Sequence, residues 1–176
     1  RKNKLKELEH EEGYISDNSE KTFYVHKGRT KEIERENTPE VGQIVITKRS
    51  SEFNELTGLP AGSPLSGAVF EIYNTTGNLV DKISSGSNGV AASKGLPVGV
   101  YTIKEVSAPR YYALNDKTLL AEIRHNGDIV RFEVLNSSIS LNLTIQKKGP
   151  NAASPGQTIQ YDSYEVQNGA SGTLEN

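Results

Sequence analysis

The sequence contains no cysteine, methionine or tryptophan among its 176 residues. The lack of cysteine excludes disulfide bonds, thiol catalysis and thiolate metal sites. Histidine is also scarce, and the three that occur, His10, His26 and His125, do not have the spacing of metal ligands. We therefore expect no metal site and no cofactor.

An excess of charge of one sign is missing as well, since the formal net charge is −2 at pH 7. This leaves no electrostatic case for binding nucleic acid or an anionic membrane surface. No apolar run approaches the roughly 20 residues that a membrane-spanning helix needs, so we expect no membrane insertion in this segment. An initiator methionine and a signal peptide are absent too, and we expect an internal fragment of a longer protein.

Short runs of valine, isoleucine, threonine and tyrosine are present, separated by glycine, proline, asparagine and serine. The runs alternate with period two, and no segment keeps a helical period. This pattern is typical of all-β proteins, and it predicts tandem immunoglobulin-like antiparallel β-sandwich domains. We expect one complete domain at residues 42–137 and incomplete domains at 1–38 and 139–176.

Three polar residues occupy core positions in the expected complete domain. Lys48, Glu105 and Asn136 each end an alternating apolar row on a different expected strand. Side chains two positions apart share a face of a strand, so all three point towards the core. An amine, a carboxyl group and a carboxamide are costly to bury unless they meet. The apolar members of these rows are Ile44, Ile46, Tyr101, Ile103, Val130, Phe132 and Val134.

If the three groups meet in a dry core, they can react. Burial lowers the pKa of a lysine and raises that of a glutamate, by up to about 3–5 units when burial is complete. A neutral Lys48 amine can then attack the Asn136 amide while Glu105 relays protons and ammonia leaves, which gives an isopeptide bond. The alternative interpretation is an ordinary one, in which Lys48 is a solvated edge residue or pairs with Glu105 in a salt bridge.

An internal repeat relates residues 1–38 to the end of the complete domain. Glu7 aligns with Glu105 and Asn37 with Asn136, because the glutamate precedes the asparagine by 30 residues in one copy and by 31 in the other. Lys147 repeats the Lys48 pattern at the start of the last segment. Two explanations are open: either the flanking domains are cut short in this fragment, or strands are exchanged between chains.

Local patterns predict the elements of residues 1–38. Alternating residues indicate strands at 5–9, 22–26 and 30–37, with a turn at 11–14 and a hairpin turn at 26–29.

The motifs of residues 42–137 resemble the Cna protein B-type domain, also called the SpaA-type domain, of Gram-positive pilins and surface adhesins. The matching stretches are Ile-Val-Ile-Thr-Lys48, Leu-Ser-Gly-Ala-Val-Phe-Glu-Ile-Tyr73, Gly-Val-Tyr-Thr-Ile-Lys-Glu105 and Val-Leu-Asn136. The resemblance implies a Lys48–Asn136 cross-link with Glu105 as the catalytic glutamate, and an extracellular, cell-wall-anchored protein. The sequence departs from the family at 108–112, where Gly-Tyr is usual. Residues 141–176 resemble the start of a different surface-repeat β-domain.

Three functions are compatible with these features. The first is a structural stalk of a pilin or adhesin, whose partners are neighbouring domains or subunits of the same fibre. The second is an adhesin domain that binds a host ligand through a loop such as residues 50–64. The third is an enzyme, for example a glycosidase with paired carboxylates, which a solvent-open pocket beside Glu105 would favour. We expect the stalk, with cross-linking as a single-turnover reaction.

Overall fold

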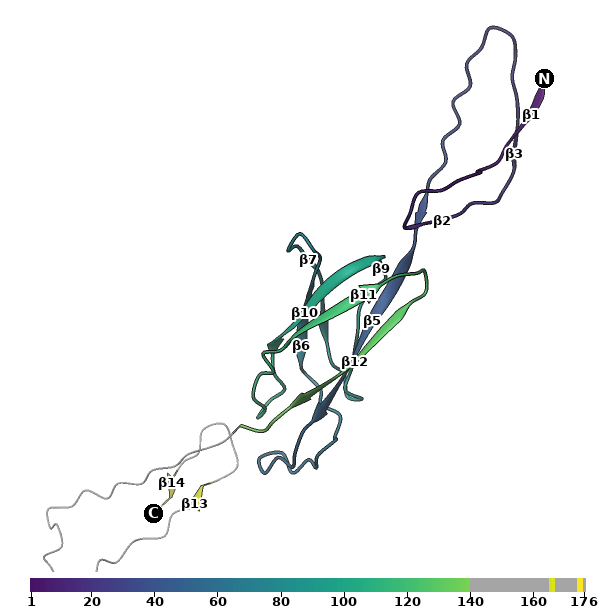
Figure 1. Ribbon diagram of the computed structural model, residues 1–176. Coiled ribbons are helices and arrows are strands. Elements are labelled where there is room, and N and C mark those ends of the chain that lie inside the picture. The colour runs from purple at the N-terminus through teal and green to yellow at the C-terminus, as the bar shows by residue number, and fades with distance from the viewer. Residues whose placement is uncertain (140–164, 167–173, 176) are drawn as a thin grey trace, which may run out of the picture.

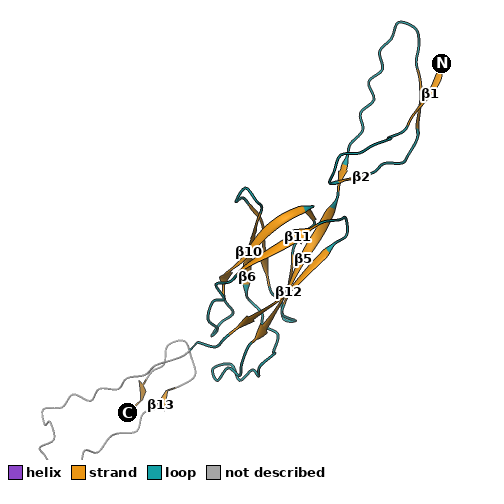
Figure 2. Ribbon diagram, in the orientation of Figure 1, coloured by secondary structure: helices purple, strands orange, loops and turns teal. Residues whose placement is uncertain are grey.

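The computed structural model describes residues 1–139, 165–166 and 174–175. Every regular element in these residues is a β-strand, as Figure 2 shows, so none of them forms a helix able to cross a membrane. The short strands β13 (Glu165–Val166) and β14 (Leu174–Glu175) pair with each other. Most of the expected domain at 139–176, including Lys147, lies outside the described residues.

Residues 41–136 form two packed sheets. The first has the strand order β11-β10-β6-β7, and the second has the order β12-β5-β8, with β9 also pairing with β5. The predicted all-β sandwich is therefore confirmed. The strands are β5 (Val41–Ser50), β6 (Val69–Tyr73), β7 (Leu79–Ser84), β8 (Val90–Ala92), β9 (Leu96–Pro97), β10 (Gly99–Ser107), β11 (Thr118–Ile123) and β12 (Ile129–Asn136).

The core lies between the two sheets and follows the predicted period of two. Along β5, every second residue from Gly42 to Ser50 is buried. The same alternation buries Tyr101, Ile103 and Glu105 on β10. Burial of these apolar rows is the main stabilising contribution to the sandwich. The buried core comprises Ile44, Ile46, Ala68, Phe70, Ile72, Ile83, Ala91, Leu96, Tyr101, Ile103, Ala121, Ile123 and Val134.

The first and last strands of the sandwich, β5 and β12, are neighbours and run parallel. All the other strand pairs of the sandwich are antiparallel, as expected from the sequence. A parallel pair needs a long crossover, and here nearly the whole domain lies between the two strands. In consequence the chain enters the sandwich at one end and leaves it at the other, as Figure 1 shows.

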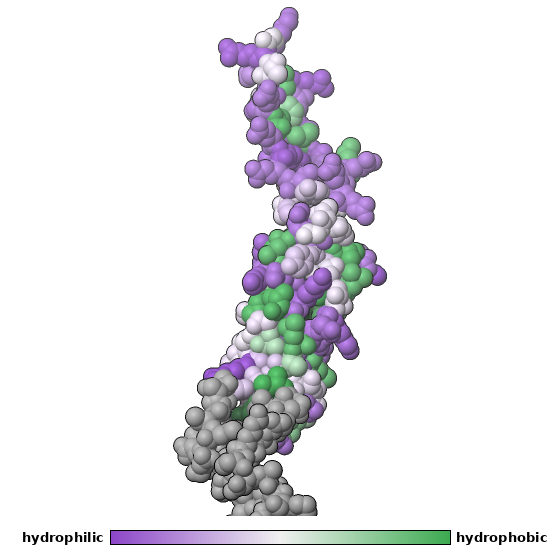
Figure 3. Space-filling view, turned by 90° about the vertical axis from the view of Figure 1, so that its left-hand side faces the viewer, coloured by the Kyte–Doolittle hydropathy of each residue, from purple (hydrophilic) through white to green (hydrophobic). Residues whose placement is uncertain are grey.

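Residues 1–40 form a separate, smaller set of strands that extends beyond the sandwich (Figure 1). β1 (Lys2–Leu5) pairs with β3 (Lys21–Tyr24), and β2 (Tyr14–Ile15) pairs with β4 (Thr38–Pro39). The only residue between β4 and β5 is Glu40. In the space-filling view of Figure 3, polar residues predominate on this segment, whereas apolar and polar patches alternate on the sandwich.

Two of the strands predicted for residues 1–38 are wrong. The first strand covers 2–5 rather than 5–9, and residues 30–37 contain no strand. The equivalent strand of the complete domain, β12, is held by β5, and no strand of residues 1–40 takes the place of β5. A segment without a pairing partner does not form a strand. The predicted turn at 26–29 is confirmed by the bond from Arg29 N–H to the His26 carbonyl, 3.3 Å.

The internal repeat is visible in the strand register. Lys2 pairs with Tyr24 in the first segment, and Val100 pairs with Glu122 in the sandwich, so both partners are shifted by 98 residues. A second correspondence lies nearby. Tyr14 pairs with Pro39, just as Tyr112 forms an isolated bridge with Ser138. Residues 1–40 thus repeat these two pairings of the last part of the sandwich, but not its β12–β5 pair.

Candidate functional site

Lys48 lies near the end of β5, with its side chain fully buried in the sandwich. Its backbone N–H donates to the Gly89 carbonyl at 2.7 Å, which joins β5 to the turn before β8. Gly89 has a φ of +77°, and a Cβ there would lie 2.5 Å from the Lys48 carbonyl oxygen. Only glycine fits this turn, both for its backbone conformation and for the space available.

Glu105 enters the same core from β10, with only 1% of its side chain exposed. The register between β10 and β6 shifts directly after it, between Glu105 and Ser107, which marks a bulge. Bulges interrupt pairing and redirect the strand, and they are frequent beside functional groups. The regular pairing of β10 with β6 thus ends at Glu105, the residue that carries the carboxyl group.

Asn136 completes the group from the end of β12, and it is 1% exposed. Val134 lies opposite Lys48, and Asn136 lies opposite Ser50. Asn136 is therefore two positions beyond the partner of Lys48, on the same face of the sheet. The parallel register, which the sequence did not predict, is what brings the two side chains together.

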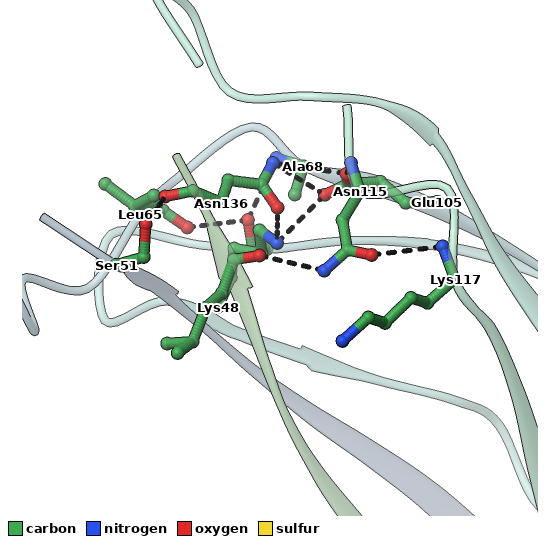
Figure 4. Close-up of polar contacts among 10 residues, drawn as sticks. Lys48, Ser51, Leu65, Ala68, Glu105, Asn115, Lys117 and Asn136 are labelled. Carbon is green, nitrogen blue, oxygen red and sulfur yellow. Dashed lines mark hydrogen bonds and ion pairs between the residues drawn. The ribbon is translucent and has the colours of Figure 1, made fainter. Parts of the chain in front are cut away.

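The three predicted side chains are in mutual contact, as Figure 4 shows. The Lys48 Nζ donates to Asn136 Oδ1 and lies 3.2 Å from Glu105 Oε1. The Asn136 Nδ2 lies 3.1 Å from both Glu105 oxygens. An amine thus touches the amide carbonyl, while the amide nitrogen faces the carboxyl group. This is the order of groups that aminolysis of the Asn136 amide requires.

Burial also prepares the amine for attack. It lowers the pKa of the Lys48 amine from the ordinary value of 10.5, although the Glu105 carboxylate acts in the opposite direction. The Lys48 side chain has no exposed surface, and the ring centroid of Phe70 lies 6.0 Å from its Nζ. Desolvation of this kind favours the neutral, nucleophilic form.

A hollow of about 230 Å³ lies beside Glu105, and its lining includes Asn115, Lys117 and Glu133. A pocket at this place was the feature expected to favour an enzyme. However, the Glu105 side chain is almost fully covered, and its carboxyl group is occupied by the contacts described above. Within the described residues, no group of three or more His, Asp or Glu side chains could hold a metal ion.

Two asparagines with structural roles were missed by sequence reasoning, and one of them, Asn115, contacts the site. Asn115 donates its backbone N–H to Glu105 Oε2 at 2.6 Å. Asn54 is fully buried in the loop at 50–64, where its side chain donates to the Tyr111 carbonyl at 2.9 Å. Backbone donors and loop asparagines leave no periodic signal. The one available signal was the spacing of ten residues from Glu105 to Asn115, which the repeat shares between Glu7 and Asp17.

The counterparts predicted in residues 1–38 are placed differently. Glu7 is partly buried, and its Oε2 accepts from the Asp17 N–H at 2.6 Å. Asn37 is exposed, and within the described residues no hydrogen bond joins it to Glu7. The first segment therefore presents the acid in an ordered setting, but it does not bring the amide to it.

The loop at 50–64, the candidate ligand-binding surface, is held from within by Asn54. Its Oδ1 accepts from the backbone N–H groups of Leu56 and Thr57, at 2.9 and 3.1 Å. The large apolar side chains that it exposes are Phe53 and Leu59, at 57% and 38%. This is a braced polar loop with two separate apolar residues rather than a broad apolar surface.

Comparison with known proteins gives a match to one family. The family model described as the SpaA prealbumin-like fold domain matches residues 43–138, more than half of the chain. The structure is similar to that of the Bacillus anthracis TIE protein, with a TM-score of 0.64 and 34% identity over 79% of this chain.

Two further similarities are to streptococcal proteins. The trypsin-resistant surface T6 protein of Streptococcus pyogenes serotype M6 is 43% identical over 56 residues, which is 32% of this chain. The solved structure of the T6 backbone pilin of serotype M6 Streptococcus pyogenes gives 28% identity over 53% of this chain, with a TM-score of 0.40. The chain spans 10% of the T6 surface protein, 20% of the T6 pilin structure and 25% of the TIE structure.

Proposed function

The chain belongs to the SpaA prealbumin-like fold domain family, and from this we propose that it is a stalk segment of a Gram-positive surface pilin or adhesin. We propose further that a Lys48–Asn136 isopeptide bond locks its sandwich. The observation that carries the proposal is the buried contact of the Lys48 amine, the Asn136 amide and the Glu105 carboxyl group.

The reaction follows from the positions of the atoms. The neutral Lys48 Nζ attacks the Asn136 side-chain carbonyl carbon, and Glu105 accepts a proton from this nitrogen through Oε1, 3.2 Å away. Glu105 then donates a proton to the Asn136 Nδ2, 3.1 Å away, and the carbon–nitrogen bond breaks. One amide is lost, one is formed, and ammonia leaves. Lysine and asparagine are both consumed, so each domain reacts once and there is no turnover.

The bond has a thermodynamic consequence. It joins residues that are 88 positions apart, which is nearly the whole domain. In the chain-entropy treatment developed for disulfides, closing a loop of this length stabilises the folded state by about 4–5 kcal/mol. A chain without cysteine gains in this way a covalent constraint that a disulfide would otherwise provide.

The proposed stalk role also implies roles for the two flanking segments and a location for the chain. Residues 1–38 are proposed as the last part of a similar domain, with Glu7 and Asn37 as counterparts of the reacting residues. Residues 139–176 are proposed as the start of another domain, to which Lys147 belongs. We propose that the chain lies outside the cell, anchored to the wall, which its similarity to a pilin and a surface protein supports. Its partners would be neighbouring domains or subunits of the same fibre.

The intact mass of the denatured protein tests the cross-link. The parent chain is expected to weigh one ammonia less than its sequence, whereas Lys48→Ala, Glu105→Ala and Asn136→Ala are each expected to show the full sequence mass. Lys104→Ala is the matched control, because Lys104 lies beside Glu105 on β10 but faces solvent. A parent chain at full mass, or a Glu105→Ala chain that still loses ammonia, would contradict the proposal.

A further inference from the structure

We propose that Asn115 is a positioning residue for the cross-linking reaction, a role that rests on the proposed function. The hydrogen bond from its backbone N–H holds Glu105 Oε2 in place, so that Oε1 stays directed towards the Lys48 amine. We call this bond, with the two side-chain bonds that fix Asn115, the Asn115 clamp.

The two oxygens of Glu105 have different surroundings. Oε2 accepts from the Asn115 N–H at 2.6 Å, the shortest bond that the carboxyl group makes. Oε1 lies 3.2 Å from the Lys48 Nζ, and both oxygens lie 3.1 Å from the Asn136 Nδ2. A carboxyl group held at one oxygen cannot rotate freely about its last torsion. The oxygen facing the amine therefore stays in place to take its proton.

Both polar atoms of the Asn115 side chain are themselves hydrogen-bonded (Figure 4). Its Oδ1 accepts from the Lys117 N–H at 3.1 Å, which closes a turn of the kind that asparagine favours. Its Nδ2 donates to the Leu135 carbonyl at 2.8 Å, directly before Asn136 on β12. One residue thus connects the loop that holds the acid to the strand that carries the amide.

The same arrangement occurs in the first copy of the repeat. The Asp17 N–H donates to Glu7 Oε2 at 2.6 Å, with the same spacing of ten residues as between Glu105 and Asn115. Asp17 Oδ1 accepts from the Ser19 N–H at 2.9 Å, two residues on, as in the clamp. Its Oδ2 accepts from Arg35 at 2.7 Å, close before Asn37.

The first copy shows that this arrangement does not depend on the buried amine. Within the described residues, no lysine forms an ion pair with Glu7, yet the bond from the backbone N–H has the same length. The turn therefore orders the carboxyl group by itself. In the sandwich, the acid is expected to be oriented as soon as β10 and the loop that follows it are formed.

The test compares reaction rates of newly made chains. Parent and variant proteins are synthesised in a cell-free system as a short pulse, quenched at intervals, and weighed intact to give the fraction that has lost ammonia. Asn115→Ala keeps the backbone N–H but removes the two neutral side-chain bonds that hold it in place. It is expected to slow the reaction about 10-fold, the combined effect of two neutral hydrogen bonds. Asn115→Ser keeps an oxygen acceptor for the Lys117 N–H and is expected to recover part of the rate.

A matched control separates positioning from general stability. Asn74 makes an equivalent turn between β6 and β7, where its Oδ1 accepts from the Thr76 N–H at 3.1 Å, away from the site. Asn74→Ala is expected to react within about twofold of the parent rate at a temperature where all chains are folded. Equal slowing by Asn74→Ala and Asn115→Ala, or parental speed in Asn115→Ala, would overturn the positioning role.

A measurement without any change at Asn115 covers the case in which that variant does not fold. In the unreacted Lys48→Ala chain, the Asn115 amide hydrogen is expected to exchange at least about tenfold more slowly than that of exposed Asp116. Equal exchange rates would refute the clamp. If the parent chain loses ammonia normally while these tests fail, only the role of Asn115 is refuted. If the parent chain never loses ammonia, the proposed cross-link and the role of Asn115 are both refuted.

Discussion

At the scale of single residues, the amine of Lys48, the carboxyl group of Glu105 and the amide of Asn136 share one buried site. Lys48, Glu105 and Asn136 were found because each continues an apolar row, and all three are buried as expected. Asn115 was missed because its main contribution is a backbone N–H, a group that almost every residue carries. Asn54 was missed because a loop has no period that marks a buried position.

The lowered pKa of Lys48 gives the reaction a pH dependence. The amine attacks only when neutral, so the rate is expected to rise with pH until the pKa of Lys48 is passed and then level off. Because burial lowers that pKa, the plateau should begin below pH 10.5, despite the opposing effect of Glu105. Pulse synthesis followed by intact mass at a series of pH values measures this. A rate still rising tenfold per unit at pH 10.5 would count against a buried amine.

The buried ion pair makes a second prediction, on stability. Glu105→Gln leaves the Lys48 amine without its counter-ion, and removing one partner of a buried pair costs about 3–5 kcal/mol. The double variant Lys48→Met, Glu105→Gln removes both charges and should regain much of that loss. The free energy of unfolding in denaturant is compared with that of Asn136→Ala, which is unlinked but keeps the pair. Equal stability of the single and double variants would show that the pair is not desolvated.

At the scale of elements, periodicity gave the faces of the strands but neither their partners nor their directions. The rows on β5 and β12 were correct, whereas their parallel pairing was not predicted, because pairing is decided between segments far apart in sequence. The error at residues 30–37 has the same origin. Their alternation resembles that of β12, but no strand like β5 is present to pair with them.

The turn before β8 supplies a test of how Lys48 is supported. Gly89→Ala places a Cβ 2.5 Å from the Lys48 carbonyl oxygen and imposes a φ of +77°, whereas Gly77→Ala imposes a φ of +80° with no atom within 4 Å. Both should lose about 1–2 kcal/mol for the backbone conformation. Gly89→Ala should lose clearly more and also link more slowly, as measured by denaturation and intact mass. Equal losses in the two variants would mean that the turn does not constrain Lys48.

At the scale of the whole molecule, the parallel pair determines the path of tension. Force applied at the two ends of the sandwich enters along β5 and leaves along β12 (Figure 1). The proposed bond between Lys48 and Asn136 would carry this force directly from one strand to the other. The chain between the bonded pair, which are 88 positions apart, would then bear none of it.

Pulling single molecules from residues on either side of the sandwich measures this directly. Unfolding of Lys48→Ala should release the chain between positions 48 and 136, which are 88 positions apart, a gain of roughly 300 Å at about 3.4 Å per position. The parent should release none of that length at any force below covalent rupture. A parent trace with the full extension step would show that tension passes through hydrogen bonds alone.

The most direct test of the account is tandem mass spectrometry of a tryptic digest of the parent protein. The account predicts a branched peptide in which the segment containing Lys48 is joined to the segment containing Asn136, with a mass one ammonia below the sum of the two. Cleavage after Lys48 should be absent in the same sample. Recovery of two linear peptides, with Lys48 cleaved and Asn136 intact, would contradict the central claim.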